Sequence, residues 1–317
     1  MKDKILLSIE TSCDDTSLAI FKNNKLLSLK SATSLNEYQK YGGIIPEIAA
    51  RSHEKNINLV LNECLKFSEI KKEDITDIAY TALPGLPGSL HVGKVYAKTL
   101  SYLLNANLIP VDHMMGHAFS FSIDKKIKIK YPFLSLVISG GNTILYLFKS
   151  VSKYVIVNQT MDDAVGECLD KIGRSLDLPY PGGISLDKTY SEKKNNLKCI
   201  PHLKENAQFS FSGIKSYATN YINTCKMKKT KLDTVALGST CLKWCVDDLI
   251  IKIKSYAEKY SITDIAIGGG VAANELLNNE LKKINNLKFF ITEKKYCGDN
   301  AAMIGQYVIL SNYKTII

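Results

Sequence analysis

The sequence lacks the features that mark secreted, disulfide-bonded and membrane-spanning proteins. Its 8 cysteines include no CxxC pair, and the nearest two, Cys241 and Cys245, are separated by three residues. Scattered cysteines are typical of free thiols, so we expect neither a disulfide framework nor a cysteine-based zinc site. No stretch approaches the roughly 18 apolar residues of a membrane span, and the opening MKDKILLSIE has no signal-peptide pattern. We therefore expect no membrane association and a cytoplasmic location, with an organelle of endosymbiotic origin as the alternative.

Arginine is also scarce, although the chain is basic. A total of 41 lysines and arginines against 31 aspartates and glutamates gives a net charge of +10, but only Arg51 and Arg174 are arginines. A positive field attracts phosphate backbones and so permits a nucleic-acid partner. A groove built for bidentate phosphate contacts would use more arginine. Lysine spread over the whole surface by compositional bias is therefore an open alternative.

The sequence does contain an alternation of short apolar runs and amphipathic stretches, which favours an α/β fold. Its 317 residues are enough for one large or two medium domains. We predict strands at 4–10, 16–22, 25–32, 77–82, 108–111, 133–138, 143–149, 263–268 and 287–291. We predict helices at 46–66, 90–104, 163–176 and 234–258, with further helices that begin at His113, at Asn274 and after Asp299.

The pattern at the start of the chain recurs near its middle. Residues 6–21, LLSIETSCDDTSLAIF, align without gaps with residues 133–148, FLSLVISGGNTILYLF, and six aligned pairs are identical. Each segment consists of an apolar strand, a polar turn and a second strand. A duplicated hairpin is expected of two lobes around a central cleft, with both turns facing a phosphate-bearing ligand. Two unrelated hairpins are the alternative.

Three residues are candidates for a metal site. His113 and His117, in HMMGH, are four residues apart and therefore share one face of a helix. Met114 stands where the HExxH motif has its glutamate, which counts against zinc-protease chemistry. Asp299, in YCGDN, precedes an apolar segment and would complete an iron or zinc site. The alternatives are two ordinary hydrogen-bonded histidines and an Asp299 that only caps the following helix.

Glycine-rich segments indicate where the backbone could approach a phosphate closely. We expect each of them to lie in a turn; they are Ser139-Gly140-Gly141, Gly182-Gly183 and Gly268-Gly269-Gly270. The last joins a predicted strand to a predicted helix, which makes it the stronger indication of a binding loop.

The segment MDDAVGECLDK is acidic. We interpret Asp162 and Asp163 as part of a solvated helix face near the N-terminus of the helix. Asp170 lies one turn beyond Glu167 and is a candidate to point into a cleft.

Taken in order, nine segments resemble the family of tRNA N6-threonylcarbamoyladenosine transferases, known as TsaD or Gcp. They are IETSCDDTSLAI, YGGIIPEIAARSH, GLPGSLHVGK, PVDHMMGH, SGGNT, DDAVGECLDKIGRSLDLPYPGG, FSFSGIKS, IGGGVAAN and CGDNAAMIG. The resemblance covers nearly the whole chain. It implies the actin-like, Hsp70-like ATPase (ASKHA) fold, with residues 1–127 as the N-terminal lobe and 128–317 as the C-terminal lobe. The last helix, about residues 299–317, is expected to pack back on the first lobe.

The resemblance also assigns the site residues. It implies that His113, His117 and Asp299 bind one divalent metal ion per subunit, Fe²⁺ in the first place and Zn²⁺ as the alternative. It implies that Asp14, with Asp15 beside it, is catalytic. The residues that it assigns to adenylate binding are Val137, Ile138, Ser139, Gly140, Gly141, Asp170, Gly183, Asp187 and Asn274.

The implied reaction transfers the threonylcarbamoyl group of threonylcarbamoyl-AMP to N6 of adenosine 37 of tRNA. The implied partners are a homologous TsaB-like subunit with a small TsaE-like ATPase, or a second copy of the chain. A metalloprotease, a non-catalytic ATP-binding scaffold of a tRNA-modifying complex and, less favoured, a sugar kinase of the same fold class are the alternatives.

Overall fold

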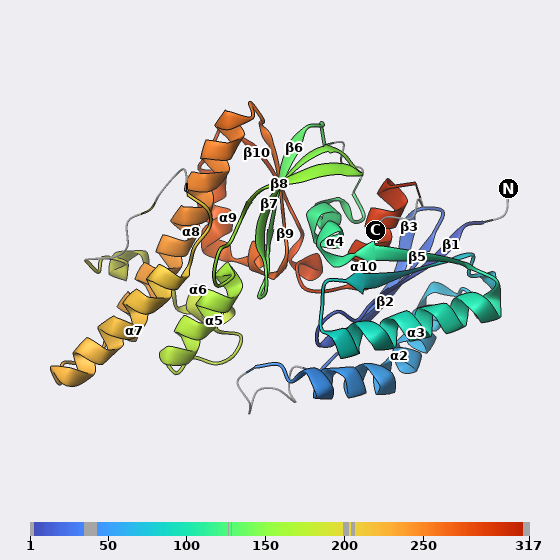
Figure 1. Ribbon diagram of the computed structural model, residues 1–317, viewed down its shortest axis with the longest axis horizontal. Helices are drawn as coiled ribbons and strands as arrows, with labels where there is room; N and C mark the ends of the chain where they lie inside the picture. Colours follow the sequence, from blue (N-terminus) through green and yellow to red (C-terminus); the bar gives the residue numbers. More distant parts are fainter. Residues whose placement is uncertain are drawn as a thin grey trace. The chain divides into compact units, whose positions relative to one another are not determined.

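The computed structural model describes residues 3–34, 43–125, 127, 129–198, 203 and 207–312. The chain divides into two compact units (Figure 1). Unit 1 comprises Met1–Lys128 and Thr292–Ile317, and unit 2 comprises Ile129–Ile291. Each unit contains a five-stranded mixed sheet with helices packed against it.

The sheet of unit 1 has the strand order β3-β2-β1-β4-β5. Its first three strands form an antiparallel meander, and β4 and β5 run parallel to β1. The strands are β1 (Ile5–Glu10), β2 (Asp15–Lys22), β3 (Lys25–Thr33), β4 (Asp77–Leu83) and β5 (Asn107–Asp112). The parallel pairing brings the carboxyl ends of β1, β4 and β5 to one edge of the sheet, where the chain leaves β5 for the predicted metal-binding helix.

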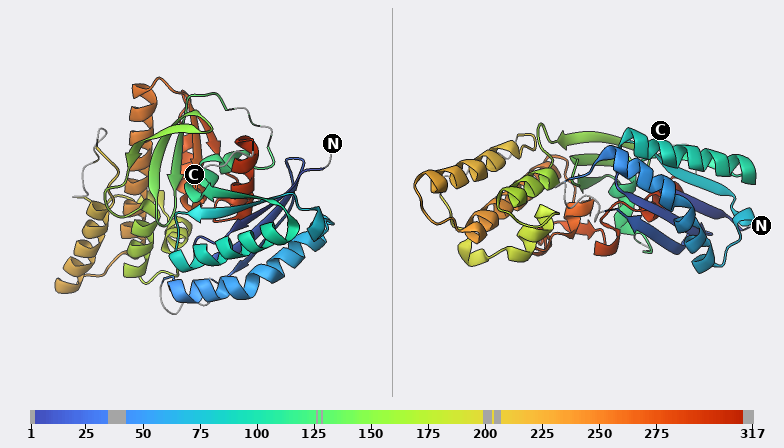
Figure 2. Two further views of the ribbon diagram at one scale, coloured as in Figure 1. Left: turned by 45° about the vertical axis from the view of Figure 1, so that its right-hand side comes forward. Right: turned by 90° about the horizontal axis from the view of Figure 1, so that it is seen from below.

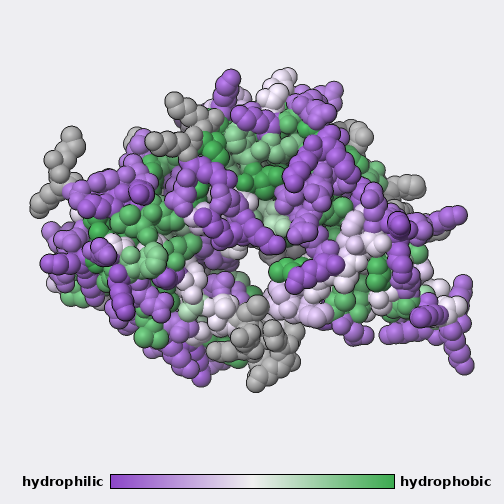
Figure 3. Space-filling view, turned by 180° about the vertical axis from the view of Figure 1, so that it is seen from behind, coloured by the Kyte–Doolittle hydropathy of each residue, from purple (hydrophilic) through white to green (hydrophobic). Residues whose placement is uncertain are grey.

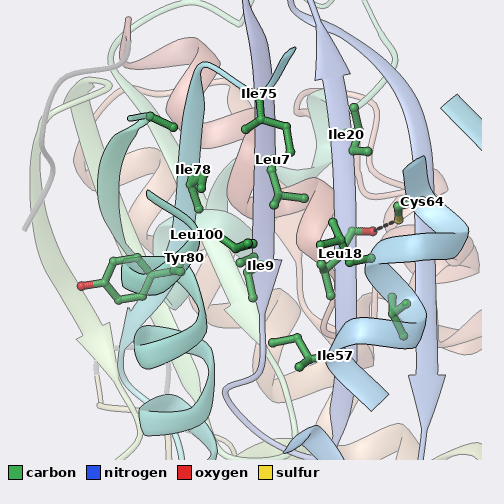
Figure 4. Close-up of a cluster of buried hydrophobic side chains, with 14 of the residues drawn as sticks. Leu7, Ile9, Leu18, Ile20, Ile57, Cys64, Ile75, Ile78, Tyr80 and Leu100 are labelled. Atoms are coloured by element: carbon green, nitrogen blue, oxygen red, sulfur yellow. Dashed lines mark hydrogen bonds between the residues drawn. The ribbon is translucent and has the colours of Figure 1, made fainter. Parts of the chain in front are cut away.

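Alternation along β1 divides its side chains between two packed faces. Leu7 and Ile9 belong to a core cluster with α2 (Pro46–Ser68) and α3 (Pro87–Leu104), which lie side by side on one face of the sheet (Figures 2 and 4). Ser8 points the other way and donates a hydrogen bond to the carbonyl of Ala301. Glu10, two residues further, shares the face of Ser8.

The opposite face is covered by α10 (Ala301–Leu310), which also packs against α4 (His113–Phe119). Residues 301–308 of α10 are all buried, as expected for a helix that is apolar on every side. Gly305 makes this close packing possible, because a Cβ there would lie 2.3 Å from the ring of Phe21. The Asp112 carboxylate accepts hydrogen bonds from the backbone amides of Met114 and Met115 and so caps α4 at its N-terminus.

Unit 2 repeats the topology of unit 1. Its strand order is β10-β9-β6-β7-β8, again an antiparallel meander with two strands parallel to its first strand. The strands are β6 (Phe133–Ile138), β7 (Thr143–Ser150), β8 (Lys153–Gln159), β9 (Asp264–Gly268) and β10 (Lys288–Ile291). The two similar segments found in the sequence are the β1–β2 and β6–β7 hairpins, so the predicted hairpins are confirmed.

The helices of unit 2 form contacts with one another around this sheet. They are α5 (Val165–Ser175), α6 (Gly182–Thr189), α7 (Ser212–Met227), α8 (Thr234–Lys259) and α9 (Glu275–Lys282). Short 3-10 helices occur in the two units at Lys72–Asp74, Ser120–Ser122, Glu192–Lys194, Gly270–Ala273 and Lys294–Tyr296. In the described part of the chain, no helix is both long and apolar enough to cross a membrane.

Three elements were missing from the sequence prediction. In β8, four of the first five side chains are exposed, so the strand has no alternation of buried and exposed residues. Helix α6 begins with Gly182 and Gly183, which we had predicted to lie in a turn; that prediction is wrong. Helix α7 buries Ile214, Ala218 and Ile222, a narrow stripe at helical spacing that the sequence prediction did not use.

The surface carries both hydrophilic and hydrophobic residues. On the face of the molecule that Figure 3 shows, hydrophilic residues are spread over the elements of each unit, with hydrophobic residues between them.

The packing of α10 gives a first prediction. Gly305→Ala should destabilise unit 1 by about 1–3 kcal/mol, because its Cβ would meet the fully buried ring of Phe21, which has little room to move. Urea unfolding followed by circular dichroism measures the change. Gly270→Ala is the control, since a Cβ there meets nothing within 4 Å. An unchanged midpoint for Gly305→Ala would contradict the packing described.

Candidate functional site

The two histidines of HMMGH and the distant Asp299 meet in unit 1. Nε2 of His117 lies 3.0 Å from Oδ1 of Asp299, and Nε2 of His113 lies 3.5 Å from the same oxygen. One donor atom from each residue falls within a group no wider than 4.8 Å. His113 and His117 are four residues apart on α4, so their rings lie on one helix face, where they meet edge to face with centroids 4.6 Å apart. The sequence-predicted metal ligands are thus brought together, and their binding of a metal stays a prediction.

Asp299 does not cap α10. The cap is Asn300, whose side-chain oxygen accepts a hydrogen bond from the Met303 amide. The alternative interpretation of Asp299 as a helix cap is therefore wrong. Its carboxylate is directed to the histidines instead.

Charges govern the ionisation of this cluster. Burial alone would raise the pKa of Asp299, but His113 and His117 hold that pKa far below its ordinary value. Burial alone would lower the pKa of His113, but the carboxylates of Glu10 and Asp299 raise it well above the usual range. Glu10 is itself fully buried, and His113 keeps its pKa low against the effect of burial. The protein therefore concentrates negative charge on two carboxylates around the histidine pair.

The donor set fits a divalent ion. Two imidazole nitrogens and one carboxylate oxygen are ligands that both iron and zinc accept. Nε2 of each histidine faces the Asp299 oxygen, and Nδ1 of His117 is buried with no hydrogen-bond partner in the described part of the chain. The cluster therefore presents three potential metal-ligand atoms that lie close together.

The predicted catalytic carboxylates lie in the turn between β1 and β2. Burial raises the pKa of Asp14, and it raises the pKa of Asp15 to about 6. The charge of Asp299 contributes to both increases, so the acidic turn and the histidine cluster are electrostatic neighbours. One carboxylate oxygen of Asp15 is buried and has no hydrogen-bond partner among the residues that the structure describes.

His53 of α2 holds this turn in place. Its Nε2 lies 3.0 Å from the Cys13 carbonyl, which can only accept, so Nε2 carries a proton. Its Nδ1 then accepts from the Thr16 hydroxyl at 2.8 Å. The Ser89 hydroxyl donates to the same Cys13 carbonyl at 3.1 Å. His53 is not among the residues predicted from the sequence, although it lies in YGGIIPEIAARSH, one of the nine matching segments.

In unit 2, the turn after β6 is the open part of the predicted adenylate site. The Val137 and Ile138 side chains are fully buried, so only their backbone could contact a ligand. A Cβ on Gly140 or Gly141 would meet nothing within 4 Å, which leaves space beside the turn. Ser139 closes the turn, with its hydroxyl accepting a hydrogen bond from the Asn142 amide.

Two other glycines converge on this turn. A Cβ on Gly166, in the first turn of α5, would lie 2.5 Å from the Ser139 carbonyl, and one on Gly269 would lie 2.3 Å from the Ile138 carbonyl. Gly269 also has a φ of +92°, which favours glycine. The carboxyl ends of the parallel strands β6 and β9 and the N-terminus of α5 therefore meet here, an arrangement that suits an anion.

The remaining predicted residues connect helices. The Asp170 carboxylate accepts a hydrogen bond from the Gly183 amide at 3.0 Å and so joins α5 to α6. The Asp187 carboxylate accepts from the Glu275 amide at 2.8 Å, at the start of α9. Asn274 caps α9. These polar side chains are thus already engaged with backbone amides.

Asp162 and Asp163 do not belong to a solvated helix face. Both precede α5, which begins at Val165. Asp162 accepts hydrogen bonds from the amides of Phe211 and Ser212 at the start of α7, and Asp163 forms ion pairs with two lysines, Lys171 and Lys215. That part of the sequence interpretation is wrong.

Comparison with solved structures agrees with the actin-like fold. Full-length HypF, in its phosphate- and nucleotide-bound form, matches 98% of this chain and 55% of its own with a TM-score of 0.62 at 11% identity. HypF of T. kodakarensis matches 99% of this chain and 49% of its own with a TM-score of 0.61 at 12% identity. At these identities the likeness concerns the fold alone, and it confirms the predicted fold class.

The amino-acid sequence also matches a known family and its members. The family model for TsaD, tRNA N6-adenosine threonylcarbamoyltransferase, matches residues 25–306. The protein of that name from Ureaplasma parvum serovar 3 is 46% identical over 315 residues, which cover 99% of this chain and 98% of the relative. The one from Malacoplasma penetrans is 44% identical and covers 95% and 97%. The chain therefore belongs to the TsaD family, the tRNA N6-adenosine threonylcarbamoyltransferases.

Proposed function

We propose that the chain transfers the threonylcarbamoyl group of threonylcarbamoyl-AMP to N6 of adenosine 37 of tRNA, with His113, His117 and Asp299 holding one divalent metal ion. The observation that carries the metal-dependent part is the meeting of these three donors, two from α4 and one from the residue before the cap of α10. These ligand types suit both Fe²⁺, the ion that the family resemblance implies, and Zn²⁺, the alternative. A divalent ion bound there supplies Lewis-acid polarisation of a carbonyl oxygen.

The adenylate end of the substrate is assigned to unit 2. Its phosphate would accept hydrogen bonds from backbone amides of the Ser139–Gly141 turn and from the N-terminus of α5, which carries partial positive charge. Asp170, Asp187 and Asn274 support that assignment indirectly, because they hold α5, α6 and α9 in place. Gly183 contributes its backbone amide to the same arrangement.

The acidic turn supplies the base. The N6 amine attacks the carbamoyl carbon, the bond from that carbon to the phosphate oxygen breaks, and the amine loses a proton. An aromatic amine is a weak nucleophile, so positioning and proton removal must lower the barrier. Asp15, with its pKa raised to about 6, is a stronger base than an ordinary aspartate and is still ionised at neutral pH.

The other candidate functions gain no support from these observations. Met114, where a zinc protease of the HExxH type has its glutamate, is buried and cannot activate water. A non-catalytic scaffold or a sugar kinase would not call for the histidine cluster. A reconstituted assay decides whether a TsaB-like subunit with a TsaE-like ATPase, or a second copy of the chain, takes part. It contains labelled threonine, ATP, bicarbonate, the adenylate-forming enzyme and unmodified tRNA, and it is run with and without the candidate partners.

Removal of a metal ligand gives the second prediction. His113→Ala should abolish stoichiometric binding of iron or zinc and lower transfer of labelled threonine to tRNA by at least about a hundredfold, since Lewis-acid assistance is worth several kcal/mol. Metal content by mass spectrometry and transfer activity are measured on the same sample. His91→Ala, at an exposed position of α3, is the matched control and should change neither. Full activity of a metal-free His113→Ala protein would refute the proposal.

The pKa of Asp15 gives the third prediction. A base must be deprotonated, so kcat/KM should fall as the pH drops through about 6, by about tenfold per pH unit. Asp15→Asn should lower kcat by about a hundredfold and remove this acidic limb from the pH profile. Asp14→Asn is the comparison and should keep the limb. Persistence of the same limb in Asp15→Asn would show that another group is the base.

A further inference from the structure

The last residue of β1, Glu10, is a fully buried carboxylate for which the reaction described above has no use. A buried charge of this kind is costly unless hydrogen bonds compensate for it. Oε1 accepts from the backbone amide of Ser12, and Oε2 accepts from the Thr81 hydroxyl. Oε2 also lies 3.0 Å from Nδ1 of His113. The carboxylate is thus surrounded by three donors from three parts of unit 1.

The contact with His113 determines where the imidazole carries its proton. A carboxylate can only accept, so Nδ1 must donate to Glu10. The Ser12 hydroxyl oxygen, 3.2 Å from the same Nδ1, can accept part of this hydrogen bond. Nε2 is then the nitrogen left for a metal, and Nε2 is the atom that faces Asp299.

We propose that Glu10 is a positioning residue that fixes the tautomer and the ring orientation of His113, so that Nε2 is presented to the divalent ion of the proposed metal site. A carboxylate behind a ligating histidine orients the ring and strengthens it as a ligand. Among the described residues, none gives His117 such support, since its Nδ1 is buried without a hydrogen-bond partner there. Glu10 therefore acts on one of the two histidine ligands, and this inference rests on the metal site proposed above.

Replacement of the carboxylate by an amide reverses the arrangement. The Ser12 amide is part of the backbone and keeps its direction, so the side-chain oxygen of a glutamine must face it. The glutamine NH₂ group would then face Nδ1 of His113. That nitrogen would have to accept, and the proton would move to Nε2, where the metal should bind.

The test is a zinc titration of the metal-free, full-length protein against a chromophoric chelator. Glu10→Gln should weaken Zn²⁺ binding about 10- to 100-fold, the range found when an outer carboxylate of a metal site is removed. Thr81→Val is the matched control: it removes one donor from Glu10 but leaves the contact with His113, so Zn²⁺ affinity should stay within about threefold. Circular dichroism establishes that each variant is folded. Glu10→Gln with an affinity within about threefold of the parent overturns the proposal.

His113→Ala in the same titration separates this proposal from the metal site itself. If His113→Ala binds Zn²⁺ as tightly as the parent, the site is wrong. If it loses Zn²⁺ while Glu10→Gln does not, the site stands and only the role of Glu10 is wrong. The ¹⁵N NMR spectrum of the zinc-loaded parent gives an answer even if Glu10→Gln does not fold: His113 should show a protonated Nδ1 and a metal-bound Nε2, and the reverse assignment overturns the proposal.

Discussion

The packing of the last helix on the first sheet is the contact on which the candidate site depends. The Ser8 hydroxyl donates to the Ala301 carbonyl at 2.7 Å, and the Ala301 amide donates to the Ser17 hydroxyl at 3.0 Å. Gly305 allows the helix to come this close to the strands. These contacts bring Asp299 to His117, although 182 positions separate the two residues in the chain. Without them the two histidines of α4 would have no third donor beside them.

Electrostatic balance is the second constraint on this part of the protein. Glu10 and Asp299 place two negative charges in a buried region, and only their hydrogen bonds and the histidines offset the cost. A divalent cation carries the charge that would neutralise both carboxylates. The same field extends to the turn between β1 and β2, where Asp299 contributes to the raised pKa of Asp14 and of Asp15. The features that favour a cation and those that favour a base thus arise from one group of carboxylates.

Unit 2 has the same topology but a different hairpin turn. Its hairpin turn is rich in glycine where that of unit 1 is acidic, so backbone amides replace carboxylates as the available groups. The carboxylates of Asp170 and Asp187 are used to join helices, which fixes the N-termini around the turn. A duplicated fold thus offers one turn with carboxylates that can accept a proton and another with backbone amides that suit a phosphate.

Much of this could be predicted from the residues alone. Apolar periodicity located most strands and the long helices, the HMMGH spacing placed two imidazoles on one helix face, and nine ordered segments pointed to the family. These features are local, or depend only on the order of segments, so they are readable without coordinates. The β8 strand and α6 were missed because their burial patterns are too weak to stand out, whereas α7 was missed although its buried residues recur every four positions.

Only the tertiary structure decided which polar groups face one another. The sequence indicates only that Glu10 ends a strand and that His53 lies in a helix. It does not indicate that Glu10 contacts His113 or that His53 contacts the Cys13 carbonyl. Asp299 could have been a helix cap until its neighbour Asn300 was seen to fill that place. The reason is that a hydrogen bond requires two groups to meet within about 3 Å. For residues a hundred or more positions apart, packing of whole elements sets that distance, and no local pattern records it.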